Sequence, residues 1–239
     1  MSGIFVMVDG LDGSGKGIIV MTLAEHLEAR GKKIFDLRQY CKKHGTLPEV
    51  NDIKEFDVII SAEPTYSLVG RALREEIIRK QDRIYSGIST AHAYALDREI
   101  LYRKLIIPSL KEGKIILQER GVITSLVYQP VQMEQISLHD IMNLPGNRLA
   151  LKTPPNLLVI TRTHPEVAMA RLDEREKKDH AIFENLSFQQ KIELRYESDW
   201  LKKIFESIGT KVSYMDTNGT IEETKANIVR IFEEQFGKS

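Results

Sequence analysis

Apolar residues in this chain gather into short runs that alternate with longer amphipathic stretches. Short runs rich in β-branched residues predict strands at 4–8, 33–37, 57–60, 114–117, 157–161 and 211–214. Longer stretches predict helices at 15–30, 68–80, 89–110, 165–175, 187–208 and 221–236. The strand runs are mostly apolar throughout, which is typical of a parallel sheet covered on both faces. The alternation therefore predicts an α/β fold, a doubly wound parallel sheet with helices on both faces.

Two segments interrupt this alternation. Residues 39–56 carry lysines, His44, Pro48 and Asp52, and they resemble an insertion between two strands. Residues 131–155 are rich in Asn, Pro and Gly with few periodic signals, which predicts a long loop containing a short helix. The length of 239 residues fits one large α/β domain, so we expect residues 1–239 to form a single domain.

Charge and cysteine content exclude several classes of protein. Lys+Arg and Asp+Glu number 34 each, and this balance argues against a nucleic acid polymer or an anionic membrane as partner. Cys41 is the single cysteine, which excludes an intramolecular disulfide and a cysteine-based metal cluster. The sequence has neither a signal peptide nor an apolar run of the roughly 20 residues that span a bilayer. We therefore expect a cytoplasmic protein.

A glycine-rich stretch joins the first predicted strand to the first predicted helix. In this context it predicts a P-loop, whose backbone N–H groups surround a polyphosphate while a lysine reaches the outer phosphates. The consensus continues with Ser or Thr, which holds Mg²⁺, but this chain has Gly17 there. The pattern predicts a P-loop NTPase that binds a nucleoside triphosphate with an altered metal shell. The expected binding residues are Gly10, Asp12, Gly13, Ser14, Gly15, Lys16, Gly17 and Ile18.

Charged residues follow two further predicted strands. Glu63 and Pro64 come after the strand at 57–60, and Glu119 and Arg120 after the strand at 114–117. The carboxyl ends of parallel strands form the ligand crevice of such folds. There an acid can bind Mg²⁺ and an arginine a phosphate. From the residues alone, Glu63 could equally be a carboxylate that caps the next helix. Glu119 and Arg120 could be a surface ion pair.

Residues 171–183 mix cations and acids. One interpretation is a solvated helix end. The other is a mobile lid that brings cations over a phosphoryl group during transfer. The candidate cations are Arg171, Arg175, Lys177 and Lys178.

Together these motifs resemble the thymidylate kinases, archaeal-type members most closely, which are P-loop enzymes of the nucleoside monophosphate kinase type. The likeness covers nearly the whole chain outside 39–56 and 131–155. It is carried by residues 10–16, 62–65, 70–75, 94–98, 119–129 and 182–184.

The resemblance implies transfer of the ATP γ-phosphoryl to dTMP, with Mg²⁺, by a homodimer. Tyr94 would stack on thymine and Arg98 would bond its carbonyl edge. Asp12 would hold the 3′-hydroxyl, and Tyr128 would crowd the 2′ position. The implied catalytic residues are Lys16, Arg120, Glu119 and Arg175, with Glu119 also expected to anchor the metal. The implied substrate-binding residues are Asp12, Glu63, Pro64, Arg74, Tyr94, Arg98, Arg120, Ser125 and Tyr128.

Several positions depart from the family pattern. Gly17 and the following Ile18 replace hydroxyl residues, and Glu119 replaces an aspartate. Gly121 stands for an aromatic residue, and Ala62 stands where many bacterial members carry arginine. Gly17 and Glu119 bear on the geometry of the metal, and Ala62 bears on how strongly the acceptor phosphate is bound.

Two alternative functions stay open. Deoxynucleoside kinases also carry Glu-Pro and Glu-Arg pairs, although a tryptophan closely follows their glutamate. The single tryptophan here is Trp200, far downstream. The second alternative is a P-loop protein that binds nucleotide with little turnover, which the missing hydroxyl at Gly17 would allow.

Overall fold

The computed structural model describes residues 3–79, 81–131, 136–174 and 185–237. Six parallel strands form one sheet in the order β2-β3-β4-β1-β5-β6. The strands are β1 (Ile4–Gly10), β2 (Ile34–Asp36), β3 (Val58–Ala62), β4 (Ile115–Glu119), β5 (Leu157–Arg162) and β6 (Lys211–Asp216). Every strand coincides with a predicted apolar run, and the predicted doubly wound α/β fold is confirmed.

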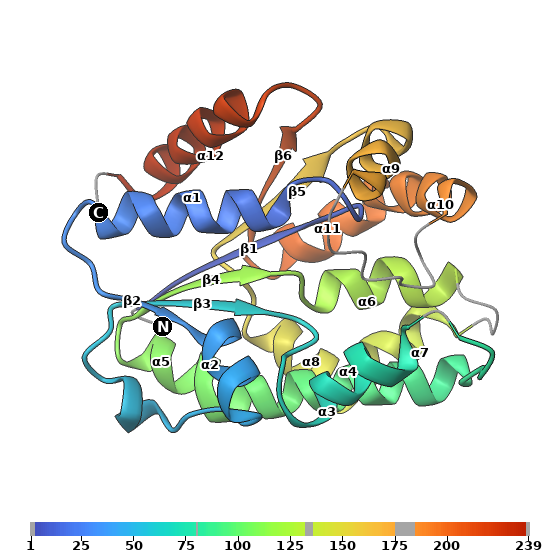
Figure 1. Cartoon of the computed structure of the whole chain (residues 1–239), viewed down its shortest axis with the longest axis horizontal. Coiled ribbons are helices and arrows are strands. Elements are labelled where there is room, and N and C mark those ends of the chain that lie inside the picture. Colours follow the sequence, from blue (N-terminus) through green and yellow to red (C-terminus); the bar gives the residue numbers. More distant parts are fainter. Residues whose placement is uncertain (1–2, 80, 132–135, 175–184, 238–239) are drawn as a thin grey trace.

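Helices cover both faces of this sheet (Figure 1). On one face lie α1 (Lys16–Glu28) and α12 (Ile221–Phe236), which pack against residues such as Val6 and Val8. On the other face, Phe5 and Met7 belong to a second core that they share with most of the remaining helices. Neighbouring residues of β1 are thus buried on opposite faces, which explains why the strands are apolar throughout.

The remaining helices belong mostly to the second face. They are α2 (Leu37–His44), α3 (Leu68–Ala72), α4 (Gly87–Leu101), α5 (Ile107–Lys111), α6 (Val122–Tyr128), α7 (Leu138–Asn143), α8 (Pro145–Lys152), α9 (Pro165–Asp173), α10 (Leu186–Tyr196) and α11 (Asp199–Ser207). Short 3-10 turns occupy Val50–Ile53 and Gln129–Val131, and π-helical turns occupy Leu73–Ile77 and Tyr102–Ile106. Among the described helices, none is long and apolar enough to cross a membrane.

The predicted insertion at 39–56 is a folded part of the molecule. β2 pairs with β3 at the edge of the sheet, and α2 follows β2 directly. The Asp36 carboxylate caps α2 by accepting a hydrogen bond from the Arg38 backbone N–H at 2.9 Å. Leu37 and Cys41 bury α2 in the second core. The position of α2 is therefore fixed by packing and by its cap.

The prediction of a long loop over 131–155 is wrong, because this segment contains both α7 and α8. Ser137 caps α7 through its hydroxyl, and Pro145 stands in the first turn of α8. Gly146 lies where α8 crosses α4, and a Cβ there would come within 1.8 Å of the Ala95 carbonyl oxygen. The Pro and Gly that suggested a loop are here a helix start and a close helix contact.

The helix predicted over 187–208 is also divided, into α10 and α11. Between them, Ser198 adopts an extended conformation with ψ of 137°. Its hydroxyl donates to the Arg195 carbonyl oxygen at 2.5 Å, which satisfies the last turn of α10. Serine favours helix boundaries for this reason, and apolar periodicity alone could not reveal the break.

Candidate active site

The P-loop connects the end of β1 to the start of α1. Gly13 and Gly15 have φ angles of +81° and +87°, in the left-handed region that favours glycine. A Cβ on Gly13 would lie 2.2 Å from the carbonyl oxygen of Ala168 in α9. The loop therefore needs glycine both for its turn and for its close packing on α9.

Lys16 stands at the first position of α1 and is 4% exposed. Its ammonium group donates to the carbonyl oxygens of Gly10 at 3.3 Å and Leu11 at 2.5 Å, so it closes over the loop. Burial lowers the pKa of Lys16 to about 8, and the nearby Arg120 contributes in the same direction. A polyphosphate in the loop would supply the negative charge that this ammonium group favours.

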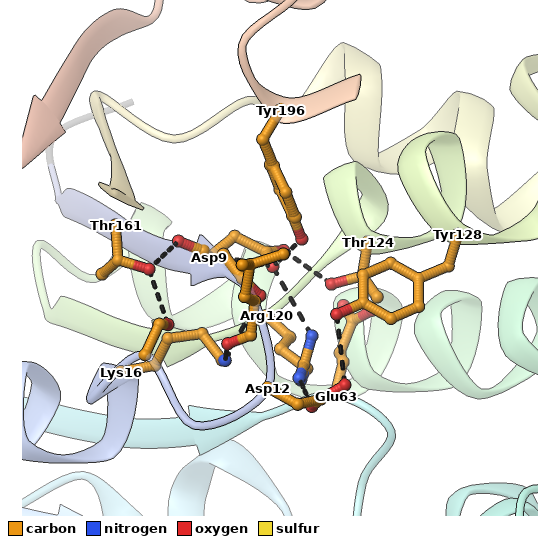
Figure 2. A network of polar contacts seen from close by, with 12 residues as sticks. Asp9, Asp12, Lys16, Glu63, Arg120, Thr124, Tyr128, Thr161 and Tyr196 are labelled. Carbon is orange, nitrogen blue, oxygen red and sulfur yellow. Dashed lines mark hydrogen bonds and ion pairs between the residues drawn. The ribbon is translucent and has the colours of Figure 1, made fainter. Parts of the chain in front are cut away.

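Asp9, the residue before Gly10, ties the loop to two helices (Figure 2). It is fully buried in β1. Its carboxylate accepts hydrogen bonds from the Tyr196 hydroxyl at 2.7 Å and the Thr124 hydroxyl at 2.6 Å. Our sequence analysis did not single out Asp9, although a carboxylate ending an apolar strand was a visible signal. The consequence is a rigid junction of β1, α6 and α10 behind the P-loop.

Arg120 follows β4 with a φ of +64°, an uncommon value for a residue other than glycine. Its Nη2 atom donates to Asp12 Oδ1, and its Nη1 atom makes no hydrogen bond among the described residues. Asp12 also accepts from the Tyr128 hydroxyl and the Gln189 amide, each at 3.2 Å. Burial raises the pKa of Asp12, but Arg120 and Lys16 outweigh it and hold the pKa below its usual value. Asp12 is therefore a carboxylate that several donors hold in one place.

A second polar cluster surrounds Arg98, which is 1% exposed. Its Nη2 and Nε atoms lie 2.6 and 2.7 Å from Glu63 Oε2, and Nη2 also donates to Ser125 at 3.1 Å. Its Nη1 atom donates to Asn147 in α8. The other Glu63 oxygen accepts from the Gln118 amide at 3.0 Å. The predicted site residues Glu63, Arg98 and Ser125 thus form one buried cluster.

A pocket of about 460 Å³ opens between the P-loop and this cluster. The predicted site residues that line it are Asp12, Gly13, Gly15, Lys16, Gly17, Glu63, Pro64, Arg74, Tyr94, Arg98, Glu119, Arg120, Ser125 and Tyr128. Burial raises the pKa of Tyr94 to about 12, so this side chain stays a neutral phenol at physiological pH.

Other predicted residues do not line this pocket. Gly10 ends β1, Ser14 is buried under a hydrogen bond from Thr161 at 2.7 Å, and Ile18 is 36% exposed on α1. Arg171 donates to the Thr217 carbonyl oxygen at 2.8 Å, which ties it to the loop after β6. The other lid candidates, Arg175, Lys177 and Lys178, lie outside the described residues.

The sequence analysis missed three contributors near the pocket. Lys42 and Tyr66 line it, and Asn147 holds Arg98 from the segment that we expected to be a loop. The mixed compositions of 39–56 and 131–155 contained no signal that could place Lys42 and Asn147, whereas Tyr66 closely follows Glu63 and Pro64 in the sequence.

The structure brings Glu119 to the position where the P-loop consensus has a hydroxyl. Glu119 Oε2 would lie 3.6 Å from a Cβ added to Gly17. The described residues contain no cluster of three or more His, Cys, Asp or Glu that could hold a metal. Mg²⁺ is usually bound by one or two carboxylates together with waters and substrate phosphates. The residues therefore fit a Mg²⁺ ion that binds with a nucleotide.

The parallel sheet, the P-loop and the adjoining pocket define a phosphotransferase of the nucleoside monophosphate kinase class. A family model described as thymidylate kinase matches residues 49–228, and it begins after the P-loop. The chain therefore belongs to the thymidylate kinase family, as the motifs predicted.

Curated relatives extend this likeness across the P-loop. A thymidylate kinase of Caldicellulosiruptor saccharolyticus is 24% identical over 238 residues, covering 100% of both chains. A probable thymidylate kinase of Thermococcus gammatolerans is 26% identical over 240 residues, covering 98% of each. One of Pyrococcus abyssi is 26% identical over 239 residues, covering 99% of this chain and 98% of the relative.

Proposed function

We propose that this protein is a thymidylate kinase, which transfers the γ-phosphoryl of ATP to dTMP and yields dTDP and ADP. The observation that carries the proposal is the shared pocket. It joins the P-loop lysine, Lys16, to the predicted acceptor residues Tyr94 and Arg98, and Arg120 lines the same pocket. Membership of the thymidylate kinase family supports the same reaction.

The donor phosphates would bind at the P-loop. Backbone N–H groups of the loop and the start of α1 favour negative charge. Lys16 would turn from the carbonyl oxygens of Gly10 and Leu11 toward the outer phosphates. Arg120, with Arg74 beside it, is the candidate for the acceptor phosphate: its guanidinium lines the pocket and is held by Asp12 and, at 3.7 Å, by Asp9. Phosphoryl transfer needs little covalent chemistry from the protein, so positioning and charge stabilisation would account for catalysis.

The acceptor would occupy the side of the pocket lined by Tyr94 and Arg98. Tyr94 would offer its ring to thymine, and Arg98 a donor to a base carbonyl. Tyr128 and Asp12 adjoin one another through the hydrogen bond of 3.2 Å. This contact supports the expectation that they face the 2′ and 3′ positions of one sugar.

The environment of Glu63 argues against the deoxynucleoside kinase alternative. In that reaction the glutamate takes a proton from a 5′-hydroxyl. Here one Glu63 oxygen accepts from Arg98 and the other from Gln118, and the side chain is 3% exposed. A carboxylate engaged in this way positions Arg98, which favours an acceptor that already bears a phosphate.

The function is tested by ADP release with dTMP, dUMP, UMP, thymidine or no acceptor. We expect dTMP and dUMP to be used better than UMP by roughly tenfold, because the extra hydroxyl would be desolvated against Tyr128 at ~1–3 kcal/mol. Tyr128→Ala should reduce this preference, and Tyr128→Phe should show what the bond to Asp12 contributes. Phosphorylation of thymidine instead of dTMP, or ADP release that no acceptor changes, would contradict the proposal.

Glu119 is expected to anchor the Mg²⁺ that accompanies ATP, where the ion would neutralise phosphate charge. Glu119→Gln should raise the Mg²⁺ concentration for half-maximal rate by about tenfold or more. Glu75→Gln removes the same charge from another carboxylate of the pocket and serves as control. Gly17→Ser fits sterically, since its Cβ would lie 3.6 Å from Glu119 Oε2. Added to Glu119→Gln, it should recover part of the lost Mg²⁺ affinity. An unchanged Mg²⁺ dependence in Glu119→Gln would exclude this role.

We further propose that residues 1–239 act as one kinase domain whose lid supplies a cation from Arg175, Lys177 or Lys178. A homodimer and a cytoplasmic location are parts of the same proposal.

A further inference from the structure

Helix α2, which overlaps the predicted insertion at 39–56, places a lysine at the nucleotide pocket. Lys42 is exposed in the last turn of α2 and lines the pocket together with Tyr66 and Arg74. The Lys42 ammonium lies 4.3 Å from the centroid of the Tyr66 ring. The Arg74 guanidinium lies 3.9 Å from the same centroid. One aromatic ring thus holds two cations from different segments at the pocket wall.

The positions of these groups are fixed by their surroundings. Cys41, the residue before Lys42, is 1% exposed in the second core, and the Asp36 carboxylate caps the other end of α2. Arg74 donates from Nε to the Pro64 carbonyl oxygen at 2.8 Å. Both cations are therefore attached to the same wall of the pocket that carries Glu63 and Pro64.

The formal charge of the pocket lining is positive. Three of its acids are ion-paired within the lining, as Glu63–Arg98, Glu75–Arg71 and Asp12–Arg120. The other charged residues of the lining are Lys16, Lys42, Arg74 and Glu119. Lys16 belongs to the P-loop, whereas Lys42 and Arg74 bring positive charge to the pocket wall at Tyr66. β3, which leads into that wall, ends at Ala62 and brings no charge itself.

We propose that Lys42, held on Tyr66 beside Arg74, binds the 5′-phosphate of the acceptor nucleoside monophosphate. The added segment would then be part of the substrate site, and Lys42 would supply the charge that Ala62 does not. A lysine is suited to this task because its ammonium is a compact charge on a flexible stem that reaches a phosphate from an exposed position. The proposal rests on the proposed function, since it assigns a residue to the same acceptor.

The test is the affinity of the full chain for dTMP and for thymidine, measured by calorimetry. Lys42→Ala should weaken dTMP binding by about tenfold, as expected for one hydrogen bond to a charged group, and leave thymidine binding unchanged. In kinetics, KM for dTMP should rise while KM for ATP stays the same. Lys42→Arg should restore most of the affinity.

Lys43→Ala is the matched control. Lys43 is exposed in the same last turn of α2 but does not line the pocket. Both variants remove one positive charge from the helix C-terminus, so any effect on helix stability is shared. A second pair tests the ring: Tyr66→Phe should preserve dTMP affinity, and Tyr66→Leu should lower it.

The outcomes separate this proposal from the function itself. If the wild type binds dTMP and Lys42→Ala binds it equally well, Lys42 has no role in phosphate binding and the kinase function stands. Equal losses for dTMP and thymidine would also overturn the proposal, because thymidine has no phosphate. If the wild type binds no dTMP, both the role of Lys42 and the proposed kinase function are contradicted.

Discussion

Replacing Arg120 by alanine is expected to lower kcat by about 10³-fold or more, the range found for arginines that stabilise a transferring phosphoryl group. Arg120 lines the pocket directly beside Asp12, and its Nη1 atom makes no hydrogen bond among the described residues. Its backbone holds a φ of +64°, which costs free energy in any residue except glycine. Asp9 and Asp12 hold this partly buried guanidinium at the pocket, where we expect it to contact a phosphate.

The measurement compares kcat and ATP affinity in Arg120→Ala, Arg120→Lys and the wild type. Arg120→Lys keeps the charge but loses the planar fork, so it should recover only part of the rate. Arg103→Ala is the control, because it breaks an exposed ion pair with Glu99, at 2.8 Å, outside the pocket lining. Thermal unfolding followed by circular dichroism shows whether the variants remain folded. A folded Arg120→Ala with near-normal kcat would exclude its assignment to phosphoryl transfer.

The sequence was sufficient to predict the sheet and most of the pocket. Strands buried on both faces, such as β1 and β5, are mostly apolar and are visible as runs, whereas the edge strands β2 and β6 are only partly buried. Carboxyl ends of parallel strands meet at one edge, so Gly10 at the end of β1, Glu63 after β3 and Arg120 after β4 could be expected near one another. The P-loop, which follows β1, indicated that this edge of the sheet carries the nucleotide site.

What the sequence did not reveal depends on packing between distant segments. Asn147 is fully buried where it accepts from Arg98 and donates to the Ile141 carbonyl oxygen. In the sequence it resembles any loop asparagine. Lys42 similarly belongs to a mixed stretch, and only the docking of α2 through Leu37 and Cys41 brings it to the pocket. Neither position follows from local periodicity.

Arg98→Ala should have two separable effects, one on stability and one on dTMP. The variant leaves the buried Glu63 carboxylate without its ion-pair partner, at 3% exposure. Removing one member of a buried pair typically destabilises a protein by about 3–5 kcal/mol. For a chain of this size the melting temperature should fall on the order of 10 °C. The loss of a charged donor should also raise KM for dTMP by roughly tenfold to a hundredfold.

A double variant separates the two effects. In Arg98→Met with Glu63→Gln, neither side chain carries a charge, the methionine fills much of the arginine's volume, and the amide can still meet Gln118. Most of the stability should return, because neutral groups replacing a buried ion pair cost little. KM for dTMP should stay high, since no donor faces the base, while KM for ATP should match the wild type. If both Michaelis constants return to wild-type values with stability, Arg98 acts through the fold alone and not as a ligand of thymine.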